Sequence, residues 1–280
     1  RLRCDWSSDV CSSDLAAATC LAVCGILFSS GQARAAVVAA WTFDNDFTAD
    51  VGGAAFDLTA VNGATAGAPG GVFGNAASFS RASSQYAFTA GNVLTVGSDF
   101  SYSAWYSSTV TDVGGGRYFV LETMLTDAPT GGGSAWTASL GLRRVSGANV
   151  MQVYTHPSQL IFNIAGGNAT DGGGLPMWHN VVITYDAGSG EFNSYLDGTL
   201  FGTLTSAAAR TAVEGLVIGG HRAGTGRNFD GLIDDVAFYD NVLSQSYITA
   251  LQSASAIPEP TIPALLGLMC AGLFLRRRRG

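Results

Sequence analysis

Hydrophobic and polar positions alternate with a period of two in short runs between residues 36 and 243, and helical periodicity is nearly absent there. The clearest run is FSYSAWY, residues 100–106. Its alternate positions on one face are Phe100, Tyr102, Ala104 and Tyr106, with Trp105 on the other face. Clusters of Gly, Asn, Asp and Ser separate the runs, so the pattern predicts short strands joined by turns, as in an all-β sandwich.

A predicted hairpin is the best-defined local structure. Strands over residues 178–186 and 191–198 flank the loop AGSG, and Asp197-Gly198 turns the chain into a third strand at 199–202. Other predicted strands cover residues 38–43, parts of 76–88, 216–219 and 232–239. Residues 242–253 predict one short helix with Ser244 as its N-cap. Such a strand meander needs a second sheet to cover its apolar face.

Four blocks of sequence carry a resemblance to a known family. They are AWTFD from residue 40, FSYSAWY, WHNVVITYD with YLDGTLFG, and LVIGGHRAGTGRNFDGLIDDVAFYDNVLS from residue 216. Together they resemble a laminin-G-like domain of the concanavalin A-like lectin/glucanase superfamily, over most of residues 36–253. The resemblance implies a jelly-roll sandwich of two antiparallel sheets, each of about six or seven strands, one of them curved to give a concave face.

The N-terminus predicts two segments that precede this domain. Residues 16–35 contain an apolar stretch that ends in Ala33-Arg34-Ala35, a pattern typical of a secretory signal peptide. Upstream, CDWSSDVCSSDL resembles a translated short-read sequencing adapter, so residues 1–15 are interpreted as non-native.

Charge and cysteine usage exclude several functions. Residues 36–253 contain 7 Arg and 17 Asp or Glu, a formal charge of −10, and no Lys. This acidic body argues against nucleic acid as a partner. All five cysteines lie outside it, so the domain is predicted to have neither a disulfide nor a thiolate metal site.

Catalysis is not expected. Some relatives in this superfamily are glycoside hydrolases that use paired carboxylates, often as Glu-x-Asp-x-x-Glu. The four glutamates are Glu122, Glu191, Glu214 and Glu259, and none has this spacing. His179 begins a strand and is interpreted as a rim residue rather than a base. The prediction is therefore a non-enzymatic domain with no catalytic residues.

Carbohydrate binding is the usual non-catalytic role that the resemblance implies, and it requires accessible aromatic platforms beside hydrogen-bonding groups. The aromatic candidates are Trp105, Tyr106, Tyr118, Trp136 and Tyr154. The resemblance also implies one structural Ca²⁺ where the first and last strands meet, with Asp44 and Asp235 as carboxylate ligands. In a regular strand, Asp234 and Asp235 point to opposite faces, so only one can reach a shared ion. The other interpretation of these acids is that they end strands and cap turns.

The C-terminus, residues 254–280, resembles a PEP-CTERM sorting signal of Gram-negative bacteria. Its parts are the triplet Pro258, Glu259 and Pro260, an apolar helix over 262–275, and the basic run Arg276, Arg277, Arg278 and Arg279. Fourteen helical residues span about 21 Å, which is short of a hydrocarbon core of about 30 Å. The resemblance implies transient anchoring in the inner membrane and processing by an exosortase; a lasting single-span anchor is the alternative.

The sequence thus predicts an exported protein of the cell surface or extracellular matrix whose domain binds carbohydrate or matrix components, with extracellular polysaccharide or a surface glycan as partner. One alternative is a structural or adhesive protein that binds other proteins. Another is a glycoside hydrolase with unrecognised carboxylates.

Overall fold

The computed structural model describes residues 35–89, 99–108, 178–205, 215–220 and 227–253 in full, and only the backbone of the strands between 117 and 163. The predicted leader before residue 35 and the predicted sorting tail 254–280 lie outside the described residues. Within the part of the chain that the structure describes, no helix combines the length and apolar character needed to traverse a bilayer.

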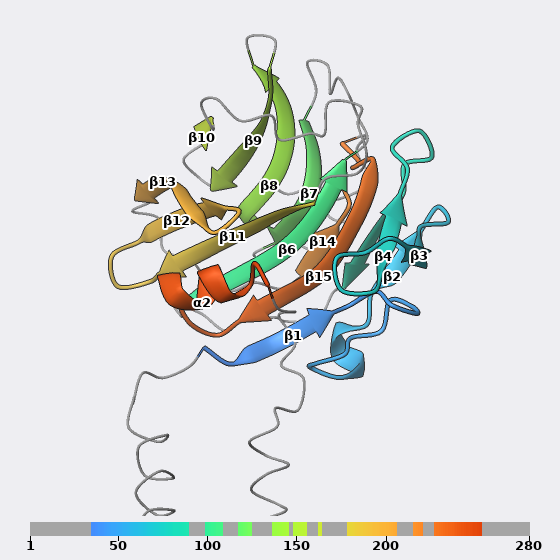
Figure 1. The fold of residues 1–280 in the computed structure, drawn as a ribbon, viewed down its shortest axis with the longest axis horizontal. Coiled ribbons are helices and arrows are strands. Elements are labelled where there is room, and N and C mark those ends of the chain that lie inside the picture. Colours follow the sequence, from blue (N-terminus) through green and yellow to red (C-terminus); the bar gives the residue numbers. More distant parts are fainter. Residues whose placement is uncertain are drawn as a thin grey trace, which may run out of the picture. The chain divides into compact units, whose positions relative to one another are not determined.

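Two antiparallel sheets form a sandwich (Figure 1). Sheet A has eight strands, in the order β13-β12-β11-β6-β15-β4-β3, with β1 also paired to β15. Their bounds are β1 Val37–Trp41, β3 Thr65–Pro69, β4 Asn75–Phe79, β6 Phe100–Ser108, β11 His179–Asp186, β12 Glu191–Leu196, β13 Thr199–Thr205 and β15 Gly231–Tyr239. The predicted sandwich is confirmed, although this sheet has more strands than the resemblance implied.

Sheet B has seven strands, in the order β10-β9-β8-β7-β14-β5-β2. Their bounds are β2 Thr59–Val61, β5 Tyr86–Thr89, β7 Arg117–Met124, β8 Trp136–Val145, β9 Ala148–Thr155, β10 Phe162–Asn163 and β14 Gly215–Ile218. The chain crosses between the two sheets several times. For example, β14 of sheet B is followed in sequence by β15 at the centre of sheet A. Two short helices complete the described elements, η1 at Ala54–Phe56 and α2 at Gln245–Ala250.

The predicted hairpin is confirmed. Strands β11 and β12 pair from Val181↔Leu196 to Asp186↔Glu191. The next turn, Asp197-Gly198, joins β12 to β13. Both of its residues have positive φ, 48° and 76°, as a two-residue turn of type I′ requires.

The core lies between the sheets and contains the predicted alternate positions of β6. Phe100, Tyr102, Ala104 and Tyr106 are at most 2% exposed and belong to the main hydrophobic cluster. From sheet B, Leu216 and Ile218 of β14 join the same cluster. The Phe100 ring stacks on Phe238 of β15 with centroids 5.7 Å apart. The alternating sequence pattern of β6 therefore predicted correctly which of its residues face the core.

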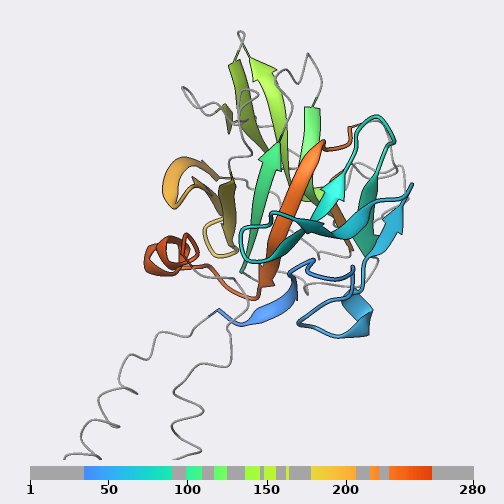
Figure 2. The ribbon, with the colours of Figure 1, turned by 45° about the vertical axis from the view of Figure 1, so that its right-hand side comes forward.

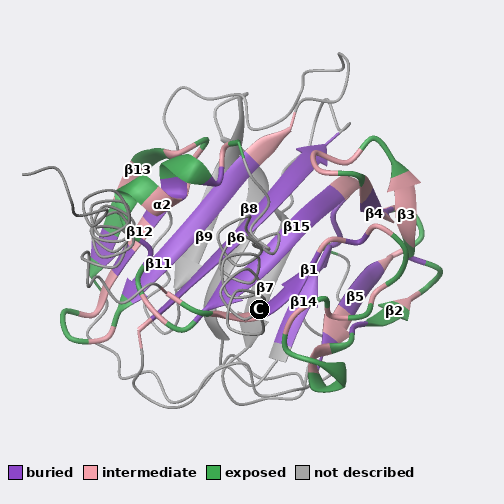
Figure 3. Cartoon of the chain, turned by 60° about the horizontal axis from the view of Figure 1, so that its bottom comes forward, coloured by how far each residue is buried: buried purple, intermediate pink, exposed green. Residues whose placement is uncertain are grey.

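The outer face of sheet A is also covered. Helix α2 lies beside this sheet (Figure 2). Leu243, Ile248 and Leu251, from α2 and its flanks, belong to one buried cluster with Ala237 and Tyr239 of β15 and Val182 of β11. All nine residues of β6 are buried, so both of its faces are closed (Figure 3). Ser244 is the N-cap of α2 as predicted, since its Oγ accepts the Tyr247 N–H.

Candidate functional site

The segment that joins β3 to β4, residues 70–75, has the sequence GGVFGN and is called here the GGVFGN segment. Three of its six residues are glycines, and two aspartates approach its backbone closely. A Cβ on Gly74 would overlap Asp44 Oδ1, and a Cβ on Gly71 would lie 2.8 Å from Asp234 Oδ2. Glycine is therefore required here for the close approach of backbone and carboxylate.

Two aspartates from strands far apart in sequence hold the GGVFGN segment. Asp44 follows β1; its Oδ1 accepts the Asn75 N–H at 2.8 Å, and its backbone carbonyl accepts the Asn75 Nδ2–H at 2.9 Å. Asp234 lies in β15, and its Oδ2 accepts N–H groups of Val72 at 2.7 Å and Phe73 at 3.3 Å. The segment is thereby tied to both the first and the last strand of sheet A.

Asp234 is the more buried of these two carboxylates, with 1% of its surface exposed. Its Oδ1 accepts the Asp235 N–H at 2.7 Å, so both carboxylate oxygens are used. Burial raises the pKa of Asp234 to about 6, against the three backbone N–H groups, which favour the charged form. The neighbouring charge of Asp235 acts in the same direction as burial.

This raised pKa predicts a pH dependence of stability. The folded protein retains the Asp234 proton where the unfolded chain, with a pKa near 3.8, has lost it. Its contribution is therefore fully present below about pH 4 and is lost as the pH rises to about 6, by up to about 3 kcal/mol. Urea unfolding of wild type and Asp234→Asn across pH 4 to 7 measures it as the difference between the two curves. A constant difference would contradict the prediction. Hydrogen bonds lower the pKa values of Asp46 and Asp186, so these two groups make stability rise with pH at lower pH values. They do so equally in wild type and in Asp234→Asn, and their effect cancels in the difference.

The regular alternation assumed for Asp234 and Asp235 is wrong. The pairing of β15 with β6 shifts register between Asp234 and Ala237, and Asp235 has a left-handed φ of 46°. Ile233 and Val236 both face the core, so one extra residue is inserted between them. A β-bulge of this kind changes the direction of the side chains in it. Adjacent positions such as Asp234 and Asp235 therefore need not face opposite sides of the sheet.

The predicted calcium ligands lie at one end of the β1–β15 pair. Trp41 pairs with Val236, which places Asp44 and Asp235 just beyond that pairing on their own strands. Asp44 uses Oδ1 for Asn75, and Asp235 is 2% exposed within the bulge. Among the described residues, no group of three or more His, Cys, Asp or Glu side chains is arranged to hold a metal ion.

Phe73 of the GGVFGN segment and two neighbouring tryptophans form an aromatic group. Trp105 of β6 lies beneath Phe73, with ring centroids 6.0 Å apart and the rings edge to face. Trp178, which precedes β11, donates its indole N–H to the Gly70 carbonyl at 3.1 Å. Trp105 pairs across the sheet with Asp234, so the aromatic group and the buried carboxylate are neighbours. Phe73, Trp178 and Asp234 were not among the predicted site residues; the glycine-rich GGVFGN sequence was the available signal.

The other predicted aromatic residues have different places. Tyr106 is fully buried, and its ring lies against Phe229 in the core. Tyr118, Trp136 and Tyr154 belong to β7, β8 and β9, and their side chains lie outside the described residues. On the outer face of sheet B, Tyr86 and Phe88 pack with Val61 and Val217, the two rings 6.1 Å apart.

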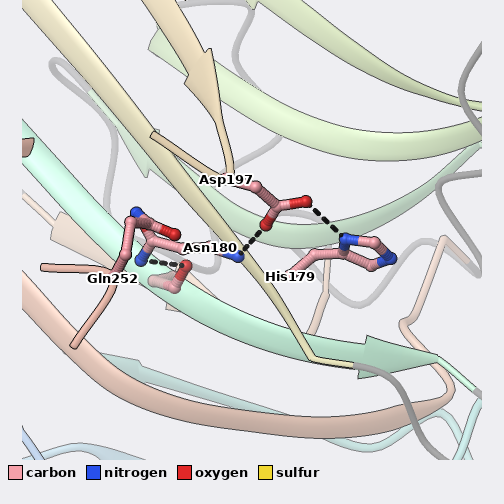
Figure 4. A network of polar contacts seen from close by, with 5 residues as sticks. His179, Asn180, Asp197 and Gln252 are labelled. Carbon is pink, nitrogen blue, oxygen red and sulfur yellow. Dashed lines mark hydrogen bonds and ion pairs between the residues drawn. The ribbon is translucent and has the colours of Figure 1, made fainter. Parts of the chain in front are cut away.

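His179 belongs to a polar network that anchors α2 (Figure 4). Its Nδ1 lies 2.8 Å from Asp197 Oδ2, and Asp197 Oδ1 accepts the Asn180 N–H at 2.9 Å. The Asn180 side-chain oxygen accepts the Gln252 Nε2–H at 2.9 Å. The network ties the β12–β13 turn, β11 and the end of α2 together, in agreement with a structural role for His179.

Several solved structures share this fold. Domain 4 of AbnA, a GH43 extracellular arabinanase from Geobacillus stearothermophilus solved with arabinotriose, has 17% identity and a TM-score of 0.57; the match covers 79% of this chain and 100% of that one. The ligand-binding domain of botulinum neurotoxin serotype D, solved with N-acetylneuraminic acid, has 15% identity and a TM-score of 0.54, with 77% and 50% covered. This chain thus spans only half of that toxin domain. The binding domain of botulinum neurotoxin DC, in complex with SialylT, has 15% identity and a TM-score of 0.50, with 70% and 45% covered.

A search of curated proteins finds no match. The family model of laminin G type, described as the concanavalin A-like lectin/glucanases superfamily, matches residues 81–249, which is more than half of the chain. The matched region runs from the turn before β5 through most of α2, and so includes the central strands of both sheets. The chain therefore belongs to the concanavalin A-like lectin/glucanases superfamily.

Proposed function

We propose that this protein is an exported surface or matrix protein whose sandwich domain binds carbohydrate without catalysing its cleavage. The observation that carries the proposal is a group of three aromatic side chains, Phe73 of the GGVFGN segment and its neighbours Trp105 and Trp178. Sugar sites combine aromatic surfaces with a few fixed hydrogen-bonding groups, and this group provides both. Phe73 and Trp178 are partly exposed, so a ligand can reach them.

A structural neighbour whose whole chain is matched supports this role. Domain 4 of AbnA was solved with arabinotriose, and its whole chain is covered by the match. The match covers 50% of the toxin domain solved with N-acetylneuraminic acid, so that domain gives weaker support than the arabinanase domain.

A binding role without catalysis is consistent with how the two carboxylates beside these aromatic rings are used. Asp234 accepts backbone N–H groups on both oxygens, and Asp44 accepts one from Asn75. A general acid or base must exchange protons with a substrate, whereas these groups hold the protein's own backbone.

A glycan array probed with the full chain tests the proposed function. We expect binding to a defined set of glycans, weakened about tenfold or more by Phe73→Ala, because the contact of a sugar face with the Phe73 ring is lost. Leu200→Ala, a change of an exposed apolar residue on β13, is the matched control and is expected to bind as wild type does. Uniform silence would favour the structural or adhesive alternative, and release of reducing sugar would contradict the non-catalytic proposal.

A structural Ca²⁺ at Asp44 and Asp235 is part of the proposal. Calcium takes six to eight oxygen ligands, so two carboxylates would be completed by backbone carbonyls and water. Asp44 bonds to Asn75 through Oδ1, which leaves its Oδ2 to coordinate an ion. Both oxygens of Asp234 accept N–H groups, so Asp234 is poorly suited to bind a cation.

Calcium should then raise the thermal stability of the full chain. At a free concentration about 100 times the dissociation constant, the gain is about 2.7 kcal/mol, or a midpoint shift of about 5 °C or more. The measurement is a melt in calcium and in EGTA for wild type, Asp235→Ala and the exposed-turn control Asp186→Ala. The shift is expected in wild type and in the control, and it should vanish in Asp235→Ala. Equal midpoints in calcium and EGTA for wild type would refute the site.

We also propose that the N-terminal segment directs export and that the C-terminal Pro-Glu-Pro segment is read by an exosortase in a Gram-negative host, after transient anchoring in the inner membrane. Intact mass spectrometry of the surface form should give a C-terminus near Pro258–Pro260. A mature surface protein that still carries Arg276–Arg279 would contradict this processing and favour a lasting membrane anchor.

A further inference from the structure

The indole N–H of Trp105 is buried without a partner. Trp105 is 7% exposed, its Nε1 is enclosed, and no acceptor among the described residues bonds to it. A buried tryptophan N–H usually finds an acceptor, and leaving it unpaired destabilises the folded protein. Trp178, its neighbour at the same segment, shows the usual pattern by donating to Gly70. The exception at Trp105 needs an explanation.

Phe73 of the GGVFGN segment covers this indole, and the segment's short hydrogen bonds are made by Gly70, Val72 and Asn75 rather than by Phe73 itself. Its ring meets Trp105 edge to face, and its backbone N–H reaches Asp234 at a long 3.3 Å. The segment begins and ends with glycines of positive φ, Gly70 at 95° and Gly74 at 136°. Both glycines are exposed, so backbone rotation there can move Phe73 without disturbing β3 or β4.

We propose that Phe73 is a movable cover over a saccharide subsite whose floor is Trp105, and that the sugar bound there is neutral. This inference rests on the proposed carbohydrate binding and gives it a location and a ligand class. When Phe73 moves, Trp105 Nε1–H donates a hydrogen bond to a sugar oxygen, which satisfies the buried donor. The aromatic rings of Trp105, Phe73 and Trp178 then contact the apolar faces of the sugar.

The charges around the subsite select against acidic sugars. Both charged side chains that hydrogen-bond to the GGVFGN segment are aspartates, Asp44 and Asp234. Asp234 pairs directly across the sheet with Trp105 and is buried, where a second carboxylate would be repelled strongly. The domain as a whole carries a formal charge of −10 over residues 36–253. A uronate or sialate would meet this repulsion, whereas a neutral hexose or pentose would not.

An array of neutral and acidic oligosaccharides, probed with the full chain, tests the ligand class. The variants are Trp105→Phe, which removes the N–H but keeps an aromatic ring, and Phe88→Leu on the outer face of sheet B as the control. We expect the strongest ligands to be neutral, and affinity for the best one to fall at least tenfold in Trp105→Phe and less than twofold in Phe88→Leu. The thermal midpoint of the unliganded Trp105→Phe variant is expected to fall only slightly, because removal of the unpaired buried N–H offsets part of the packing that is lost with the indole.

Amide hydrogen exchange in the wild-type protein tests the movement independently of any variant. The Val72 and Phe73 amides donate to Asp234 in the closed form, so their exchange should become faster when the best neutral oligosaccharide saturates the protein. Preference for acidic glycans, or unchanged or slower exchange at these amides, would overturn the inference. If Phe88→Leu lost binding and Trp105→Phe did not, the subsite inference would be overturned, but the proposed carbohydrate-binding function would stand. If no glycan on the array bound, the proposed function itself would be refuted.

Discussion

Replacing Asp234 by Ala is expected to lower the free energy of unfolding at pH 4, where Asp234 makes its full contribution, by about 3 kcal/mol or more. The substitution removes the acceptor of three backbone N–H groups, those of Val72, Phe73 and Asp235. A buried donor left unpaired costs about 1–3 kcal/mol, and the tie between β15 and the GGVFGN segment is lost with it. The loss is large because Asp234 is only 1% exposed, so water does not readily replace the carboxylate.

Asp50→Ala is the matched control. Asp50 also accepts a backbone N–H, that of Thr42 at 2.7 Å, as well as the Thr42 hydroxyl at 2.9 Å, but it is exposed. Water can replace an exposed acceptor, so this variant should lose about 1 kcal/mol or less. Urea unfolding of both variants beside wild type measures the difference. Equal losses in the two variants would show that burial does not govern the contribution of Asp234.

Gly231→Ala is expected to destabilise the domain by about 3 kcal/mol or to prevent folding. Gly231 begins β15 with a φ of 144°, where a side chain is strained, and it pairs with both Phe79 and Ser108. A Cβ at this position would overlap the Ser107 carbonyl oxygen and lie 3.0 Å from Ser108 Cα. These are backbone atoms of the central strand β6, so relief requires a shift of the sheet itself.

Gly53→Ala separates the strain of positive φ from the steric clash. Gly53 has a φ of 76°, and a Cβ there would meet no atom within 4 Å. We expect this control to lose about 1 kcal/mol, from backbone strain alone. Thermal and urea unfolding of the two variants give the comparison. A Gly231→Ala protein as stable as the Gly53→Ala protein would contradict the close approach of β15 to β6.

The sequence by itself determined the fold class and most of the local structure that has a periodic signal. Alternation along β6 predicted its core face, and Asp197-Gly198 predicted the turn between β12 and β13. Ser244 predicted the start of α2. These features depend on residues close together in the chain, whose propensities and periods act locally. The predictions about residues beyond 253 and before 35 stay predictions.

Only the tertiary structure decided which distant residues meet. The bulge at Asp235 depends on how β15 pairs with β6, and a two-residue period in the sequence carries no sign of it. The cover of Phe73 over Trp105 likewise depends on strand order.

The GGVFGN segment shows the physical reason most directly. Its bonds to Asp44 and Asp234 join residues 31 and 162 positions apart. Such contacts form only when the first and last strands of sheet A lie side by side, as the pairing of β1 with β15 makes them. The sequence names residues that can bind a sugar or an ion, but the pairing of distant strands decides which of them face one another.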